Sequence, residues 1–120
     1  MTRSAEHLLQ DILESIRQIE EYTAGLTKER FSAEMIVQDA VVRRLEIIGE
    51  AVKGLPEELR ARHPEIPWRQ VAGARDVLSH EYFRVDLDLT WEMVKTNLPG
   101  LEASVRLMLA EGEDPAIDQS

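Results

Sequence analysis

The stretch SAEMIVQDAVVRRLEIIGEAVKG, residues 32–54, has the apolar spacing of a long helix with a wide hydrophobic face. On a helical wheel of about 100° per residue, its apolar side chains spread over roughly half of the circumference. These residues are Val37, Ala40, Val41, Leu45, Ile47, Ile48, Ala51 and Val52. Packing between two helices of one subunit needs a narrower stripe, so an arc of this width contacts more than one neighbour. The stretch therefore predicts an all-α fold with part of the arc at a dimer interface.

The two ends of this stretch carry residues that begin and stop helices. Ser32 suits the N-cap position, and Phe31 before it is placed to pack on Ile36 as a hydrophobic staple. At the other end, Gly54 follows Lys53 as a stop signal. We therefore expect one helix that starts at Ser32 and runs to Lys53.

Apolar residues at spacings of three and four predict further helices on both sides of this one. An earlier helix runs from Ala5, with Ser4 as its N-cap and Gly25 as its C-terminal stop. A short helical piece follows the central helix, opened by Pro56 and continuing through Arg62. The earlier helix is amphipathic, as a helix that covers a core must be.

Prolines shape the next part of the chain. Pro64 and Pro67 break it into turns, and Pro67 suits the first position of a third helix that includes Trp68. This helix is expected to close in residues 75–82. Trp68 and Trp91 are interpreted as anchors of the core or of an interface.

The last helix is predicted to begin after Asp86 as N-cap and to keep one apolar stripe along its length. The stripe consists of Leu87, Trp91, Val94, Leu98, Leu101, Val105 and Met108. Pro99 and Gly100 interrupt the helix without shifting the phase of the stripe. We therefore expect a kink near Asn97 and no full break.

Four main helices joined by short connections predict an antiparallel four- to five-helix bundle. The 120-residue chain is 43% hydrophobic, enough for one modest core. Residues 1–112 are expected to form this domain, and residues 113–120 an acidic, frayed tail. The chain has no cysteine, no apolar run near the roughly 20 residues of a membrane span and no signal-peptide pattern. We therefore expect a soluble, cytoplasmic protein without a membrane segment or a thiolate metal site.

The charge of the chain is unevenly distributed. The formal net charge is −9, which argues against a general nucleic-acid binder. Residues 60–84 nevertheless hold five arginines against three acidic residues, so this window is +2 and the remainder is −11. An arginine-rich strip on an acidic body suggests one local anion site. A solvated loop with scattered charge explains the strip equally well.

The octet RDVLSHEY, residues 75–82, contains the side chains best suited to chemistry. Arg75 stays protonated and presents a planar fork that fits phosphate oxygens, whereas His80 exchanges a proton near neutral pH. Cleavage of RNA through its own 2′-hydroxyl needs a base and a cation and requires no metal. We therefore predict that Arg75 stabilises charge on phosphorus and that His80 acts as general acid or base.

The spacing and number of these residues suggest a composite site. Arg75 and His80 lie five residues apart, which rotates them about 140° from each other on a regular helix. Either the helix ends near Ser79 or a partner chain contributes. Acid–base cleavage also uses two proton-transfer groups, whereas His7 is distant in sequence and His63 precedes a proline. His80 of a symmetry mate is the simplest second group, so we predict a two-fold dimer with facing octets.

Each site residue also has a plainer interpretation. Arg75 and His80 are compatible with a helix C-terminus, where positive charge meets the helix dipole favourably. Tyr82 is compatible with a half-buried cover whose hydroxyl stays in water. Asp76 has Arg75 and Lys53 as possible ion-pair partners. These interpretations need no catalytic role.

Arg44 falls in the middle of the apolar arc, between Ala40 and Ile48. An unpaired charge in a core is costly, so its guanidinium must reach solvent, find a partner or face a cleft. We treat Arg44 as a possible cleft residue.

The pattern Arg75, four residues, His80, one residue, Tyr82 resembles the R-x4-H-x-Y signature of the HEPN superfamily, and specifically of its HepT-like toxins. These toxins are the ribonuclease half of a two-gene module with a minimal nucleotidyltransferase of the MNT type. The likeness extends from about residue 5 to about residue 110. It is carried by DAVVRRLEIIGEAVKGLP at 39–56, IPWRQVAGARDVLSHEYFRVD at 66–86 and WEMVKTNLPGL at 91–101.

The resemblance implies the all-helical HEPN fold, a homodimer with a composite cleft and metal-independent cleavage of tRNA or mRNA that leaves a cyclic phosphate. It implies no cofactor. By this resemblance, Arg75 and His80 would form the catalytic pair. We predict Asp76 and Ser79, which lie between them in the sequence, as supporting residues. Tyr82 would accept AMP from the nucleotidyltransferase, which silences the toxin, because a bulky polyanion beside Arg75 repels RNA.

One residue departs from the family pattern. Asp76 stands where the family usually has asparagine, which keeps a hydrogen-bonding group but adds negative charge near the substrate. The alternative interpretation of the chain is therefore a non-catalytic helical dimer that binds a nucleotide or docks the nucleotidyltransferase.

Overall fold

The structure, a computed structural model, describes residues 2–73 and 86–112, and every regular element in these ranges is helical. The body consists of α1 (Arg3–Thr23), α3 (Met35–Gly54) and one continuous helix made of α6 (Leu87–Glu92), η2 (Met93–Asn97) and α7 (Leu98–Gly112). Shorter helices are α2 (Lys28–Ala33), α4 (Glu57–Ala61) and α5 (Trp68–Ala72). The predicted all-α class is confirmed. The expected tail, residues 113–120, lies outside the described ranges.

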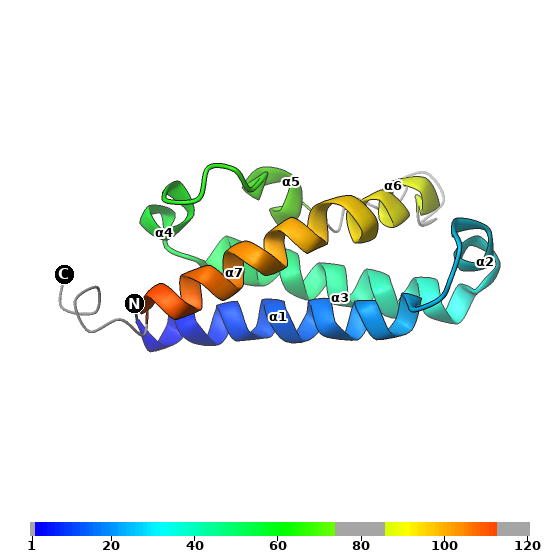
Figure 1. Cartoon of the computed structure of the whole chain (residues 1–120), viewed down its shortest axis with the longest axis horizontal. Coiled ribbons are helices and arrows are strands. Elements are labelled where there is room, and N and C mark those ends of the chain that lie inside the picture. The colour runs from blue at the N-terminus through cyan, green and yellow to red at the C-terminus, as the bar shows by residue number, and fades with distance from the viewer. Residues whose placement is uncertain (1, 74–85, 113–120) are drawn as a thin grey trace.

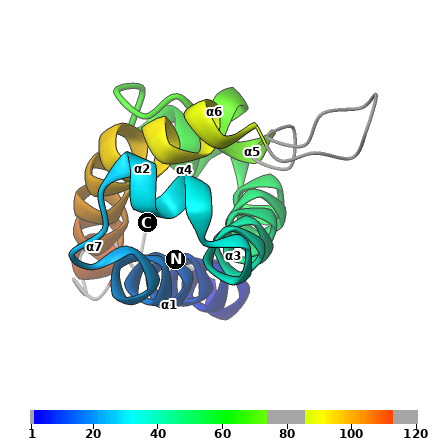
Figure 2. The same ribbon diagram turned by 90° about the vertical axis from the view of Figure 1, so that its right-hand side faces the viewer.

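The long helices form an antiparallel bundle. α1 runs in the direction opposite to both α3 and α7 (Figure 1). Seen along the long axis, α1, α3 and α7 occupy three sides, and α4, α5 and α6 lie across the fourth (Figure 2). In the part of the chain that the structure describes, no helix is long and apolar enough to cross a membrane.

The core lies between α1, α3 and α7 and is built from the apolar stripes that the sequence predicted. Fully buried side chains come from all three helices: Leu9, Ile12, Ile16 and Ile19 of α1, Val41, Leu45, Ile48 and Val52 of α3, and Leu101, Val105 and Met108 of α7. Each such residue contributes about 1.5 to 3 kcal/mol relative to an exposed one. The wide arc of α3 is explained in part by its position, because this helix contacts both α1 and α5.

Helix α1 begins earlier than predicted. Thr2 has extended backbone angles, and its Oγ1 accepts a hydrogen bond from the backbone N–H of Ala5 at 3.1 Å. Ser4 lies inside the helix, so its assignment as N-cap was wrong. The predicted stop at Gly25 is confirmed, because this residue has a φ of +73°, the left-handed conformation that glycine adopts without strain.

The predicted start of the central helix was also wrong. A separate helix, α2, begins after Thr27, whose Oγ1 accepts a hydrogen bond from Arg30 N at 3.1 Å. Ser32 is inside α2 and donates to the carbonyl of Lys28 at 2.9 Å. At Glu34 the backbone leaves helical geometry, with φ −111° and ψ 85°, and α3 follows. The predicted end of the helix at Gly54 is confirmed.

The predicted staple between Phe31 and Ile36 does not form. Phe31 is fully buried and packs on Trp91 with ring centroids 5.3 Å apart, whereas Ile36 is 84% exposed. The break at Glu34 separates the two residues into different helices. Phe31 therefore packs on Trp91, which is distant in sequence, and not on the nearby Ile36.

The last helix is close to its prediction. Asp86 caps α6 by accepting a hydrogen bond from Leu89 N at 3.0 Å. The disturbance expected near Asn97 takes the form of the π-helical turn η2, in which Leu98 N–H bonds to the carbonyl of Met93, five residues back. This turn ends two residues before Pro99, which has no N–H to donate.

Candidate functional site

The predicted site residues Arg75, Asp76, Ser79, His80 and Tyr82 lie outside the described residues. The structure defines instead how the chain enters and leaves the segment 74–85. We call residues 60–73 the upstream anchor. Residues 28–31 together with 86–91 are called the downstream anchor.

Trp68 holds the upstream anchor together. Its indole Nε1–H lies 2.9 Å from the carbonyl oxygens of both Arg60 and His63 and donates to them. The first turn of α5 is thereby joined to the end of α4. Val71, one turn later, is 1% exposed and fixes the other side of α5 in the core.

Gly49 of α3 allows the backbone of α5 to come unusually close. A Cβ atom at this position would lie 2.9 Å from the carbonyl oxygen of Ala72 and 3.3 Å from that of Val71. The first distance is shorter than a carbon and an oxygen tolerate without movement of the backbone. Glycine at position 49 therefore permits the last turn of α5, which ends at Ala72, to lie directly against α3 just before segment 74–85. The predicted continuation of this helix into residues 75–82 lies outside the described residues.

His63 ties the upstream anchor to α7. Its imidazole is buried, with Nδ1 3.3 Å from Glu65 Oε1 and Nε2 3.7 Å from Glu111 Oε2. Ser104 Oγ also donates to Glu65 Oε1, at 3.3 Å. A hydrogen bond from its own backbone N–H, followed by those from His63 and Ser104, holds the pKa of Glu65 below its usual value. Within residues 2–73 and 86–112, no cluster of His, Asp and Glu side chains is arranged to hold a metal ion.

The downstream anchor combines an aromatic contact with polar contacts. Asp86 caps α6, and its carbonyl oxygen accepts from Thr90 Oγ1 at 2.7 Å. Lys28 of α2 pairs with the exposed Asp88 at 2.7 Å. The fully buried ring of Phe31 on α2 also packs against Trp91 on α6. The chain is thus fixed on both sides of segment 74–85, by α5 before it and by α6 after it.

Arg44, the possible cleft residue, is half-buried on α3. Among the described residues it has no ion pair within 4.0 Å. Its charge helps to lower the pKa of Glu14 on α1 to about 2, an effect caused mainly by the hydrogen bond from Arg17. Arg44 therefore lies on the flank of α3 that faces α1. A role for it in a cleft stays a prediction.

The anchors were only partly visible in the sequence. Trp68 was predicted as an anchor residue, and Asp86 as a cap. Gly49 and His63 were not singled out, although a glycine inside a long apolar helix often marks a close approach of another backbone. The His63-Pro64 turn gave no sign that the imidazole would be buried.

The comparisons with known proteins agree with this fold. The model of the family "Ribonuclease HepT-like" matches residues 12–108. A Thermococcus cleftensis protein named "Probable ribonuclease HepT" is 47% identical over 102 residues, which are 85% of this chain and 93% of that protein. A "Putative RNase" of Caldanaerobacter subterraneus is 43% identical over 104 residues, which are 87% of this chain and 89% of that protein.

A third relative is longer. A Methanocaldococcus jannaschii protein named "Gamma-glutamylcyclotransferase and putative RNase" is 47% identical over 111 residues, which are 92% of this chain but only 50% of that protein. No solved structure matches. The fold and these similarities define an all-α protein of a ribonuclease family. The chain belongs to the ribonuclease HepT-like family, which confirms the resemblance and the enzyme class predicted from the sequence.

Proposed function

We propose that this protein is a metal-independent endoribonuclease that acts as the toxin of a toxin–antitoxin pair. The observation that carries the proposal is the family match over residues 12–108, because this range includes the Arg75, His80 and Tyr82 pattern. Its substrate is RNA, either tRNA or mRNA. Its active form is a homodimer in which two copies of the octet face one cleft.

The proposed reaction uses one histidine on each side of the scissile bond. His80 of one subunit takes the proton from the 2′-hydroxyl, and the resulting oxygen attacks phosphorus. The bond from phosphorus to the 5′-oxygen breaks, and His80 of the second subunit protonates that oxygen. Arg75 stabilises the charge that builds on the phosphoryl oxygens. The products are a 2′,3′-cyclic phosphate and a 5′-hydroxyl.

The two anchors support this proposal through placement. Acid–base catalysis requires reacting groups within hydrogen-bond reach of the substrate, so a segment that carries them gains from fixed ends. The upstream anchor is fixed by Trp68 and Gly49, and the downstream anchor by Asp86 and the contact of Phe31 with Trp91.

The proposed regulation is AMPylation of Tyr82 by an MNT-type nucleotidyltransferase antitoxin. A phosphate group next to Arg75 occupies the site meant for the RNA backbone and adds negative charge. Co-expression with such a partner should increase the intact mass by whole AMP units. Tyr82→Phe should prevent the increase, and Tyr22→Phe, in a half-buried tyrosine of α1, should leave it unchanged. An unmodified wild type, or modification of Tyr82→Phe, contradicts the proposal.

Cleavage is tested with purified protein and RNA in the presence of a metal chelator. The wild type should cleave, and His80→Ala should lose activity by on the order of 100-fold or more. His7→Ala is the matched control, since His7 is an exposed histidine on α1. Equal cleavage by wild type and His80→Ala, or cleavage by neither, contradicts the assignment.

The acidic charge and Asp76 favour a second candidate, a helical dimer without catalytic activity. Such a protein would bind a nucleotide or dock the nucleotidyltransferase. Calorimetry with a nucleotide, run beside the nuclease assay, separates the two. Binding without RNA cleavage by the wild type favours the second candidate.

A further inference from the structure

Positive charge in the described part of the chain gathers in the upstream anchor. Residues 60–73 hold three arginines against Glu65, whereas the other described residues hold 17 acidic against 9 basic ones. The anchor is therefore +2 and the rest of the described chain −8. Its helix α5, with α4 before it, lies on the side of the bundle opposite α1 (Figure 2).

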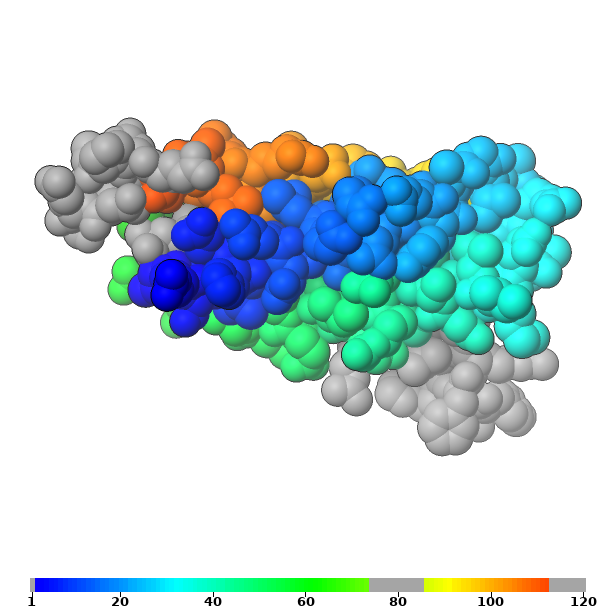
Figure 3. Space-filling view, turned by 90° about the horizontal axis from the view of Figure 1, so that it is seen from below, coloured from blue at the N-terminus to red at the C-terminus, as the bar shows by residue number. Residues whose placement is uncertain are grey.

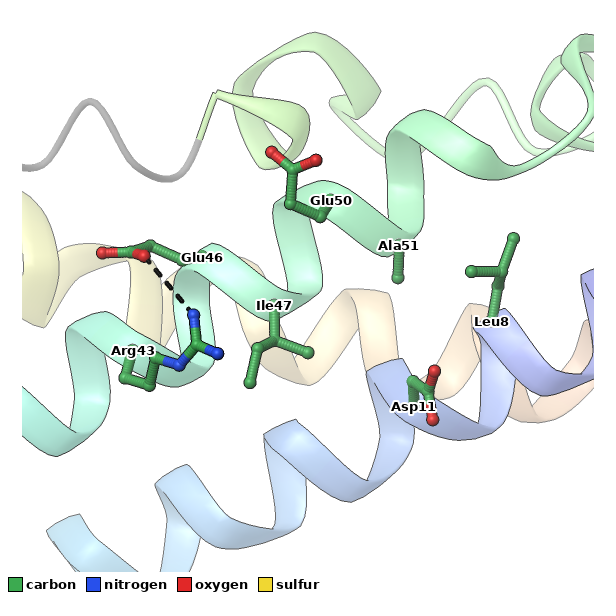
Figure 4. A pocket seen from close by; sticks show the side chains of 7 residues that line it. All are labelled: Leu8, Asp11, Arg43, Glu46, Ile47, Glu50 and Ala51. Atoms are coloured by element: carbon green, nitrogen blue, oxygen red, sulfur yellow. Dashed lines mark ion pairs between the residues drawn. The ribbon is translucent and has the colours of Figure 1, made fainter.

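The face formed by α1 and α3 is acidic. These helices lie side by side (Figure 3) and leave a groove with a volume of about 530 Å³. The groove is lined by the carboxylates of Asp11, Glu46 and Glu50 and by one guanidinium, that of Arg43, which lies 3.7 Å from Glu46 (Figure 4). Three carboxylates repel a phosphate backbone, so this groove does not suit RNA.

The arginines of the anchor differ from most other basic residues in their ion pairs. Five of the nine basic residues outside the anchor lie 2.7 to 3.7 Å from a carboxylate: Arg17, Lys28, Arg30, Arg43 and Lys53. Arg62 and Arg69 are exposed, and among the described residues neither has a carboxylate within 4.0 Å. Glu65, the acidic residue of the anchor, instead contacts His63 and Ser104. The charges of Arg62 and Arg69 are therefore not neutralised by a described neighbour.

The chain between Arg62 and Arg69 is held as one fixed unit. The carbonyl oxygen of His63 accepts hydrogen bonds from Trp68 Nε1–H at 2.9 Å and from Ile66 N–H at 3.2 Å. Ile66, between the two arginines, is buried, with 6% of its surface exposed. The backbone positions of the two arginines are therefore fixed relative to each other, as two phosphate contacts to one strand require.

Arg69 lies one helical turn before the segment that carries the motif. Its carbonyl oxygen accepts a hydrogen bond from Gly73 N–H at 3.0 Å, which closes the last turn of α5. Four residues of helix rise about 6 Å, close to two steps of about 3.4 Å along a nucleic-acid strand. A strand bound at the start of segment 74–85 therefore passes the upstream anchor within a few nucleotides.

We propose that Arg62 and Arg69 bind the RNA backbone beside the cleavage site, so that the protein acts on an extended strand and not on a short oligonucleotide. The proposal rests on the proposed function, because it assigns the place of the nucleotides that flank the scissile bond. Arginine stays protonated, and its planar fork binds phosphate oxygens. Two such residues give a chain of net charge −9 a local site for a polyanion.

Binding is tested with a labelled 2′-O-methyl RNA oligonucleotide, which lacks the 2′-hydroxyl nucleophile and stays intact. Fluorescence anisotropy measures its affinity over a series of salt concentrations. The combined substitutions Arg62→Ala and Arg69→Ala should weaken binding on the order of 10-fold at low salt. The slope of log affinity against log salt should fall by about 1.4, because each phosphate contact to a single strand contributes about 0.7. Arg62→Lys with Arg69→Lys should keep most of the slope, since lysine keeps the charge.

The matched control combines Arg17→Ala with Arg106→Ala. Both arginines are exposed, on α1 and α7, and the control changes the net charge from −9 to −11, as the substitutions in the anchor do. It should leave the salt slope unchanged, and circular dichroism checks that all variants keep their helices. Equal weakening by the two alanine pairs, no weakening by the pair in the anchor, or no binding by the wild type overturns the proposal.

Cleavage kinetics test the length of the substrate. A dinucleoside phosphate does not reach the anchor, so the wild type and the Arg62→Ala, Arg69→Ala variant should cleave it with equal kcat/KM. With a long RNA, the KM of the variant should rise on the order of 10-fold with kcat unchanged, as expected for a loss of binding alone. An equal loss on both substrates would mean that the substitutions disturb the catalytic segment, which overturns the proposal.

The two assays separate this proposal from the proposed function. If the anchor arginines control binding of the 2′-O-methyl RNA and the wild type cleaves no RNA, the binding assignment stands and the ribonuclease assignment fails. If the wild type cleaves RNA and the substitutions change neither binding nor KM, the binding assignment fails and the ribonuclease assignment stands.

Discussion

The upstream and downstream anchors of segment 74–85 hold the chain by different forces. The upstream anchor depends on close approach, with the α5 backbone against Gly49 and two carbonyls bonded to one indole N–H. The downstream anchor depends mainly on burial of Phe31 against Trp91, with an exposed cap and an exposed ion pair around it. Close approach fixes a position, whereas burial supplies stability.

This difference separates placement from stability. A change in the upstream anchor is expected to displace the start of the motif segment for a moderate loss of stability. A change in the downstream anchor is expected to cost more stability. RNA cleavage and unfolding measured on the same variants therefore test whether the two properties can be lost independently.

Phe31→Ala should have the largest effect on stability. Removal of a fully buried aromatic ring costs about 3 to 5 kcal/mol of unfolding free energy, and Phe31 is 0% exposed. Ile36→Ala is the control, since Ile36 is 84% exposed and should change stability by less than about 0.5 kcal/mol. Urea denaturation followed by circular dichroism measures both. If Phe31→Ala and Ile36→Ala lost similar amounts of unfolding free energy, burial of Phe31 would not be the main source of stability at the downstream anchor.

Trp68→Phe should follow, with a loss of about 2 kcal/mol. Phenylalanine keeps the ring but has no N–H, so the carbonyls of Arg60 and His63 each lose a donor. Trp91→Phe changes ring size without affecting the upstream anchor and is the matched comparison. An unfolding free energy of Trp68→Phe equal to that of the wild type in urea denaturation contradicts the importance of the paired hydrogen bonds.

Gly49→Ala should reduce stability by about 1 to 2 kcal/mol. The new methyl group meets the carbonyl of Ala72, which costs about 1 to 3 kcal/mol, and the better helix propensity of alanine offsets up to about 1 kcal/mol. RNA cleavage should fall more steeply than stability. Gly100→Ala is the control, because no atom lies within 4 Å of its added Cβ, and it should leave stability unchanged or higher. A gain of stability in both variants argues against the close approach.

Asp86→Ala should cost about 1 kcal/mol by removing the N-cap of α6. Asp86→Asn should restore most of the loss, since its side-chain oxygen still accepts from Leu89 N–H. Asp88→Ala removes only an ion pair whose carboxylate is 81% exposed, so thermal unfolding should hardly change. An equal loss from Asp86→Ala and Asp88→Ala would mean that local charge, and not the cap, stabilises this end.

Glu65→Gln should have the smallest effect, and the effect should depend on pH. The pKa of Glu65 is lower in the folded state, so its ionised form stabilises the fold above the unfolded value of 4.5, and this contribution is lost as pH falls below it. The difference between wild type and variant should therefore be present at neutral pH and vanish once the pH is below the lowered pKa of Glu65 in the folded state. A difference that persists in acid would assign the effect to packing around His63.

Several features determined by a few neighbouring residues were predictable from the sequence, although the N-cap of α1 is Thr2 and not the predicted Ser4. Asp86 as a cap, Gly25 as a stop and the end of α3 at Gly54 all follow local rules. The structure around α2 was not predictable from the sequence, because Phe31 packs on a residue of another helix and the backbone breaks at Glu34. Local patterns contain no information about such a distant contact.

In the candidate site, too, some features were predictable from the sequence and others were not. The motif could be recognised from residue types and spacing alone, and the roles of Arg75, His80 and Tyr82 stay predictions because these residues lie outside the described ranges. The constraint at Gly49 could not be derived, since it depends on how α5 crosses α3. A glycine within a helical sequence does not by itself show that another backbone segment packs against it.

The π-helical turn Met93–Asn97 links the direction of α6 to that of α7. Its hydrogen bond spans one residue more than that of an α-helix, so the turn behaves like an insertion absorbed within a continuous helix. Deletion of one residue here would rotate everything before it by about 100° relative to α7. Trp91 would then turn away from Phe31. The number of residues in this turn therefore sets how α6 is rotated about its axis relative to α7.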